Sequence, residues 1–199
     1  MRLDIFKKMM KKKVFMADEA KIIAFKDNPA MVNLQLHQWK KRGELLALKR
    51  GLYAFADATP EAVEIARHLC SPCYFSLEYV LSLENILPEA VFSYTLVTTQ
   101  NTRKFNTPFG LFSFRKIKRE AFSGFNPKTL VATKEKALAD YFYLNSARLV
   151  AEDNFWEESR LEAGVTEINF KKVFSYARLF HSKKLETLLR SFEFYAKSH

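Results

Sequence analysis

Apolar positions in the first part of the chain recur at helical spacing. Residues 3–10 place apolar side chains three and four positions apart with lysines between them, which predicts a first helix. Residues 14–25 continue this spacing, and Asp18 and Glu19 near the start suit the positive end of a helix dipole. A third helix is predicted over residues 29–42.

The limits of this third helix carry the strongest local signals. Asn28 can cap it, Pro29 suits its first position because proline has no N–H to satisfy there, and Gly43 suits the position after its end. One face of the helix carries an apolar stripe that we expect to be buried. The stripe consists of Val32, Leu36 and Trp39.

After Gly43 the apolar positions change to the spacing of strands. Two short apolar runs, residues 45–48 and 52–55, are separated by Lys49-Arg50-Gly51, which predicts a hairpin with a basic tip. The predicted order, three helices followed by a hairpin, is that of a winged helix-turn-helix. In such a domain the third helix enters the major groove of DNA. We predict this domain for residues 1–56.

The remaining residues, 57–199, predict a second domain of mixed α/β type that ends in helices. Thr59 is expected to cap its first helix. The expected elements are helices at 60–69 and 76–84, strands at 91–98 and 111–117 around a turn at 106–110, and helices at 133–145, 170–180 and 183–196. The whole chain is therefore expected to be an α+β protein.

Size and composition support a globular protein. The chain has 199 residues, of which 48% are hydrophobic and 19 are Phe, enough for packed cores. It contains no run of 18 apolar residues, and its basic N-terminus lacks the apolar stretch of a secretory signal. We expect a cytoplasmic protein without a membrane partner.

The positive charge is concentrated at the N-terminus. Residues 1–55 hold 13 Lys and Arg against five Asp and Glu, a net charge of +8, whereas the other residues hold 19 against 17, a net charge of +2. This asymmetry favours a nucleic-acid partner for the N-terminal domain over an anionic membrane or a merely solvated surface. Double-stranded DNA is the expected partner.

The candidate DNA-binding side chains lie on the third predicted helix and on the hairpin tip. Asn and Gln can pair with adenine, and Lys or Arg can pair with guanine or with phosphates. The helix supplies Asn33, Gln35, His37, Gln38, Lys40, Lys41 and Arg42, of which Gln35 is nearest to the apolar stripe. The hairpin supplies Lys49 and Arg50, which we assign to phosphate.

Other chemistry is sparse in the sequence. Cys70 and Cys73 form a single CxxC without further ligands at the spacing of a zinc site, so we expect two partly buried thiols. The four histidines are scattered and no phosphate-binding glycine loop is present, so we expect no cofactor, no metal and no enzymatic activity. Aromatic residues of the second domain alternate with cations, and we favour core packing over stacking on single-stranded nucleic acid.

Three segments resemble the AbiEi antitoxins of bacterial type IV toxin–antitoxin systems, which act in abortive infection. They are Trp39-Lys-Lys-Arg-Gly-Glu-Leu-Leu-Ala-Leu-Lys-Arg-Gly-Leu-Tyr53, Ser71-Pro-Cys-Tyr-Phe-Ser-Leu-Glu-Tyr-Val-Leu81 and Val131-Ala-Thr-Lys-Glu-Lys-Ala-Leu-Ala-Asp140. The resemblance implies a transcriptional repressor of its own operon, with two copies on an inverted-repeat operator. It also implies a C-terminal domain that counteracts a nucleotidyltransferase-like toxin, with Glu135, Lys136 and Asp140 on its functional surface.

Two alternatives remain open from the sequence. The winged helix could dock a nucleic-acid-processing enzyme, or the chain could be a stand-alone transcriptional regulator. The neighbouring gene and the behaviour of DNA and RNA with Mg²⁺ or Mn²⁺ would separate these hypotheses.

Overall fold

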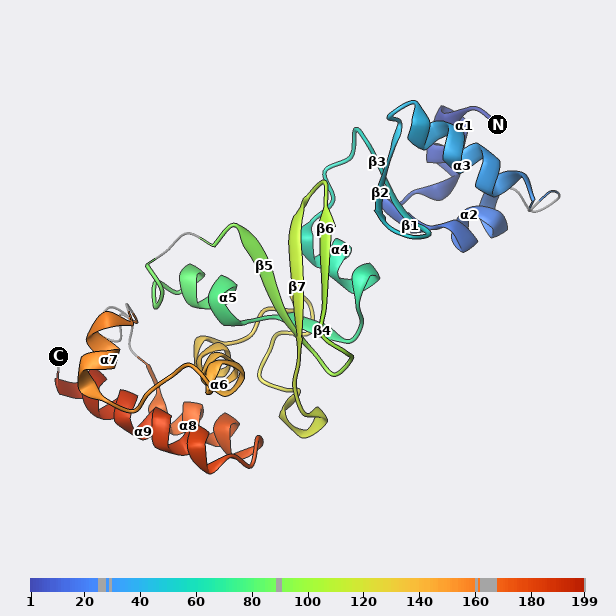
Figure 1. Cartoon of the computed structure of the whole chain (residues 1–199). Coiled ribbons are helices and arrows are strands. Elements are labelled where there is room, and N and C mark those ends of the chain that lie inside the picture. Colours follow the sequence, from blue (N-terminus) through green and yellow to red (C-terminus); the bar gives the residue numbers. More distant parts are fainter. Residues whose placement is uncertain (25–27, 29, 89–90, 160, 162–167, 199) are drawn as a thin grey trace. The chain divides into compact units, whose positions relative to one another are not determined.

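The computed structural model describes residues 1–24, 28, 30–88, 91–159, 161 and 168–198. The chain is an α+β protein and divides into two compact units (Figure 1). The N-terminal unit comprises Met1–Ser71 together with Phe105–Leu111, and the C-terminal unit comprises Pro72–Lys104 and Phe112–His199. In the described parts, none of the helices has the length and apolar character needed to cross a bilayer.

The N-terminal unit combines four helices with a three-stranded antiparallel sheet. The helices are α1 (Leu3–Met10), α2 (Ala17–Ala24), α3 (Met31–Lys41) and α4 (Ala62–Leu69). The strands are β1 (Val14–Met16), β2 (Leu45–Lys49) and β3 (Leu52–Phe55), in the order β1-β3-β2. Strands β2 and β3 form the predicted hairpin, while α4, which we placed in the second domain, belongs to this unit.

The prediction that a helix begins at Val14 is wrong. Residues Val14–Met16 form β1, which pairs with β3 in the register Val14 to Ala54 and Met16 to Leu52. β-Branched and aromatic residues fit a sheet, and here pairing with a distant strand overrides the local helical spacing. Helix α2 starts directly afterwards, where the Met16 N–H donates to Glu19 Oε2 at 2.8 Å as in a capping box.

Helix α3 begins later than predicted and ends where predicted. Its N-cap is Ala30 rather than Asn28, and Pro29 lies outside the described residues. At the other end Gly43 has a φ of +73°, a conformation that favours glycine. The Gly43 N–H donates to the Lys40 carbonyl at 3.0 Å and the Glu44 N–H to the Trp39 carbonyl at 2.9 Å, the pattern of a Schellman motif.

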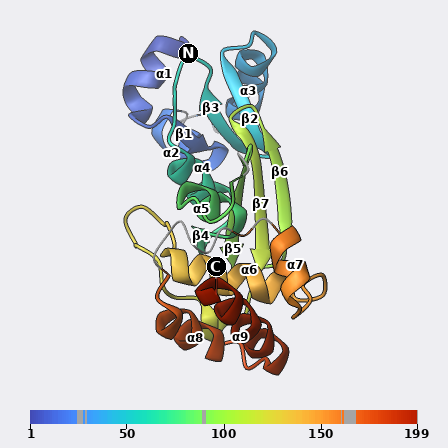
Figure 2. The same cartoon turned by 90° about the vertical axis from the view of Figure 1, so that its left-hand side faces the viewer.

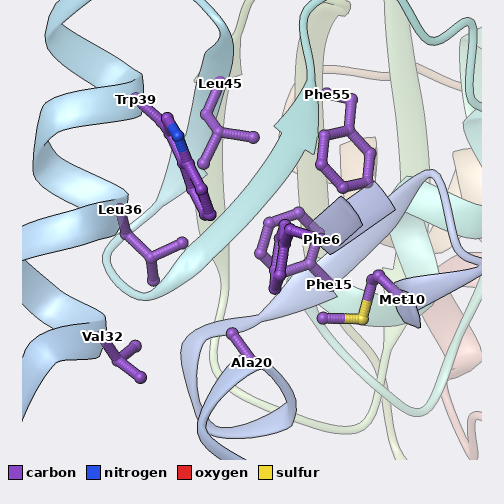
Figure 3. Packing of buried hydrophobic residues seen from close by; sticks show 9 residues of the cluster. All are labelled: Phe6, Met10, Phe15, Ala20, Val32, Leu36, Trp39, Leu45 and Phe55. Atoms are coloured by element: carbon purple, nitrogen blue, oxygen red, sulfur yellow. The ribbon is translucent and has the colours of Figure 1, made fainter. Parts of the chain in front are cut away.

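An aromatic cluster holds the three helices α1 to α3 against the sheet (Figure 3). The Phe6 ring lies at its centre, 4.9 Å from Trp39, 5.3 Å from Phe15 and 5.9 Å from Phe55 between ring centroids. The cluster consists of Phe6, Met10, Phe15, Ala20, Val32, Leu36, Trp39, Leu45 and Phe55. The predicted stripe of α3 is thus buried, which fixes the rotation of the helix about its axis.

The C-terminal unit is arranged around one of its own helices, α6 (Lys134–Asn145). The second sheet consists of β4 (Cys73–Phe75), β5 (Ser93–Thr98), β6 (Arg103–Thr107) and β7 (Gly110–Lys116), in the order β4-β5-β7-β6. Residues Phe105–Leu111 of β6 and β7 count with the N-terminal unit, and the rest of the sheet with the C-terminal unit. The other helices of the C-terminal unit are α5 (Leu77–Leu83), α7 (Asp153–Glu158), α8 (Phe170–Arg178) and α9 (Lys183–Ser198), with a short 3₁₀ turn at Arg119–Ala121. Helix α6 packs against α5 on one side and against α8 and α9 on the other (Figure 2).

One of the two N-caps predicted from the sequence in this part of the chain is correct and the other is wrong. Thr133 caps α6 as its side chain accepts the Lys136 N–H, so this predicted start is confirmed. The predicted cap at Thr59 is wrong, because α4 begins at Ala62 with Glu61 before it. Strands β4 and β6 and helix α7 are short elements that the sequence pattern did not predict.

Candidate nucleic-acid interface

The outer face of α3 is solvent-exposed because the opposite face is packed into the core. Asn33, His37 and Gln38 are all exposed, and Gln35, nearer to the apolar stripe, is half-buried. Lys40, Lys41 and Arg42 are exposed at the C-terminal end of the helix. The side chains that we assigned to base recognition therefore lie where a ligand can reach them.

The sequence pattern did not predict that α3 exposes two apolar side chains. Leu34 is 51% exposed and Met31 is 44% exposed, although both lie in the N-terminal half of the helix among polar candidates. Helical spacing could have revealed Leu34, since it lies far around the helix from the buried Val32 and Leu36.

Arg42, the C-cap residue of α3, has an ion-pair partner. Its Nε lies 3.1 Å from Glu44 Oε2, and both side chains are partly exposed. Together with Gln35 and Gln38 it lines a cleft of about 550 Å³ between α1 and α3. Arg2 and Lys7 of this cleft also pair with carboxylates, those of Asp4 and Asp57.

The two basic residues of the hairpin tip differ in their surroundings. Arg50 is exposed, whereas the Lys49 ammonium donates to the carbonyls of His68 and Leu69 at 2.7 and 2.9 Å. These carbonyls lie at the C-terminal end of α4, where the helix dipole favours a cation. Lys49 also lies 5.8 Å from the centre of the Phe105 ring. The Lys49 side chain therefore fastens the hairpin to α4, whereas the Arg50 side chain is exposed to solvent.

We expect this difference to separate the two residues in unfolding experiments. Lys49→Ala should lower the free energy of unfolding of the N-terminal unit by about 1–2 kcal/mol, because two charge-assisted hydrogen bonds are lost. Arg50→Ala should change it by less than about 0.5 kcal/mol. Urea unfolding in a Trp156→Phe background follows this unit through Trp39 alone, and equal effects of the two substitutions would contradict the assignment.

The structure corrects our assignment of Glu135, Lys136 and Asp140 to a functional surface. All three are buried on α6, with Glu135 7% exposed and the other two fully inaccessible. The Lys136 ammonium pairs with Asp140 Oδ1 one helical turn away. Side chains buried in this way are not available to a protein partner.

The buried pair joins two of the segments on which the family resemblance rests. Asp140 Oδ2 accepts hydrogen bonds from the Tyr74 hydroxyl at 2.9 Å and from the Ser76 hydroxyl at 2.8 Å. Tyr74 lies on β4, Ser76 precedes α5, and the pair lies on α6. Both motifs are thus parts of one polar network in the core of the C-terminal unit.

Aromatic rings surround the Lys136 ammonium. It lies 4.8 Å from the centre of the Phe180 ring and 5.9 Å from that of Tyr176. A Cβ on Gly124 would come within 2.9 Å of the Lys136 Cγ and 2.8 Å of the Tyr176 ring, so the backbone passes close to the pair. This packing excludes water from the charges.

Burial dominates the protonation behaviour of this network. Desolvation raises the pKa of Asp140, while Lys136 and the Ser76 and Tyr74 hydroxyls act against it. Desolvation likewise lowers the pKa of Lys136, opposed by Asp140. The pKa of Tyr74 is raised by burial and then by the neighbouring Asp140 charge, so its hydroxyl stays protonated as a hydrogen-bond donor.

The cysteines and the aromatic residues named from the sequence are largely buried where the chain is described. Cys70 directly follows α4 and Cys73 begins β4, and both are buried as thiols. Within the described ranges, His, Cys, Asp and Glu side chains do not gather in groups of three that could hold a metal ion. Phe112 and Phe114 of β7 are fully buried, and Phe112 stacks on Tyr94 at 4.6 Å, which is core packing.

Comparison with models of protein families and with curated proteins gives no match for this chain. The resemblance to the AbiEi antitoxins therefore stays a hypothesis that rests on the quoted segments.

Proposed function

We propose that the N-terminal unit is a winged helix-turn-helix domain that binds double-stranded DNA, with α3 in the major groove and the β2–β3 hairpin along the sugar-phosphate backbone. The observation that carries the proposal is the two-sided character of α3. Val32, Leu36 and Trp39 lock one face into the core, while the other presents hydrogen-bonding and basic groups to solvent. This is the arrangement that a recognition helix requires.

Each exposed group has a partner in duplex DNA. Asn33 and Gln38 have amide groups that can pair with an adenine edge. The cations Lys40, Lys41, Arg42 and Arg50 are assigned to phosphates, which fix the register of the protein on DNA. The net charge of +8 in residues 1–55 favours such a polyanionic partner.

We further propose that the chain is the antitoxin of a type IV toxin–antitoxin system in the cytoplasm. By the resemblance it represses its own operon through an inverted repeat, on which two copies bind, and its C-terminal domain counteracts a nucleotidyltransferase-like toxin. Because Glu135, Lys136 and Asp140 are buried, any direct contact with the toxin must use other residues of this domain.

DNA binding is tested with the duplex upstream of the gene in a gel shift. Asn33→Ala/Gln38→Ala should strongly reduce the preference for this duplex over an unrelated one of equal length, while weak binding to both persists. Arg50→Ala should weaken binding to both duplexes alike, because a phosphate contact carries no sequence information. Equal binding of the wild-type protein to both duplexes would contradict sequence recognition.

The antitoxin role is tested by co-expression with the adjacent open reading frame. We expect the neighbour alone to stop growth and the full chain to restore it. Restoration by a variant that no longer binds DNA would show that neutralisation does not act through repression. A harmless neighbour, or failure to restore growth, would leave a stand-alone transcriptional regulator.

A further inference from the structure

The exposed Leu34 lies in the middle of the face that α3 presents to solvent. Residues 34, 37, 38 and 41 share one side of an α-helix, since they are three, four and seven positions apart. Leu34 is therefore one turn before His37 and Gln38 and two turns before Lys41. Its side chain is 51% exposed, and Met31, one turn earlier, is 44% exposed.

Charge is distributed unevenly along the same helix. Residues 31–39 include no Lys, Arg, Asp or Glu, whereas residues 40–42 are Lys-Lys-Arg. The uncharged half suits the edges of bases, and the basic end suits phosphates. In helix-turn-helix proteins the N-terminal residues of the recognition helix contact base edges, so Leu34 lies in the half expected to reach them.

Only one group on a base edge in the major groove is apolar. The 5-methyl group of thymine distinguishes T from the other bases, and apolar side chains contact it. We infer that Leu34 reads a thymine methyl, flanked by Met31, so that the recognised site has an A·T pair beside the base contacted by Gln38. This inference rests on the proposed DNA binding and deepens it, because it names a residue that determines specificity.

The test replaces thymine by uracil, which lacks the methyl group and keeps the same base-pairing groups. A binding site is first selected by the wild-type protein from a pool of random duplexes, and each dT of the selected site is then replaced by dU in turn. We expect one position, or its two symmetry-related copies, at which each replacement weakens binding about fourfold, the effect of returning one buried methyl group to water.

The variant Leu34→Ala isolates the contact. It should bind the dT and dU duplexes equally well at that position, because the partner of the methyl group is gone. The matched control is Ile5→Ala on α1, where Ile5 is 48% exposed, and this variant should keep the full dependence on the methyl group.

Two results would overturn the inference and can be told apart. If the wild-type protein enriches no duplex, the proposed DNA binding fails and the inference with it. If a site is enriched but no dT is sensitive to its methyl group, or Leu34→Ala stays as sensitive as the wild type, only the inference about Leu34 fails.

Discussion

Replacing Asp140 by alanine should lower the free energy of unfolding of the C-terminal unit by about 3–5 kcal/mol. The substitution leaves the Lys136 ammonium buried without its counter-ion, and breaking a buried ion pair from one side is costly for this reason. The Tyr74 and Ser76 hydroxyls lose their acceptor as well. A loss of this size approaches the whole stability of a small domain.

The measurement is urea unfolding in a Trp39→Phe background, in which Trp156 reports on the C-terminal unit alone. The control is Glu193→Ala, which breaks the i,i+4 ion pair with Lys197 on α9, an exposed pair with the same spacing on another helix. That change should cost no more than about 0.5 kcal/mol.

A double variant tests whether the loss of stability comes from the unpaired charge of Lys136. Lys136→Met with Asp140→Asn removes both charges but retains an acceptor for Tyr74 and Ser76, and should recover roughly half of the loss or more. Equal costs for Asp140→Ala and Glu193→Ala would show that the buried pair has no special weight.

Affinity for duplex DNA should fall about 150-fold between about 50 and 200 mM monovalent salt. Four exposed cations at the interface, Lys40, Lys41, Arg42 and Arg50, release counter-ions on binding, and each contributes about −0.9 to the slope of log K against log salt. The expected slope is therefore about −3.6. A slope of about −4.5 would mean that Lys49 leaves α4 and joins the interface.

Double substitutions identify which lysines contribute to the salt dependence of DNA binding. Lys40→Ala/Lys41→Ala should reduce the slope by about 1.8, since two phosphate contacts are lost. The matched control is Lys8→Ala/Lys11→Ala, which removes two exposed lysines around α1 and should leave the slope unchanged. A larger change from the control pair would place the DNA on a different face of the unit.

The sequence predicted helices well where caps and buried stripes agree, and failed where distant pairing decides. The end of α3 at Gly43 and the start of α6 at Thr133 are set by residues within one turn, so local signals suffice. Strand β1 has no such signal, because its partner β3 lies nearly forty residues later. Short strands of three residues carry too few positions for a period to be detected.

The sequence predicted which kinds of side chain form the candidate site, but it predicted only some of their positions. The exposed face of α3 followed from its apolar stripe, so Asn33, His37 and Gln38 lie on the expected side. The engagement of Lys49 with α4 depends on a contact about twenty residues away in sequence, which no local pattern encodes. The same holds for the burial of Lys136 and Asp140, since charged residues on a helix ordinarily indicate a solvated face.

The network around Asp140 also governs the order in which the polypeptide can reach its native state. Tyr74 and Ser76 leave the ribosome more than sixty residues before Asp140, so until α6 is synthesised their hydroxyls find no acceptor there. Closing a loop of this length carries an entropic cost, so we expect the contacts of Asp140 to form late on the nascent chain. Any fragment that ends between residues 77 and 139 therefore contains both hydroxyls without this acceptor.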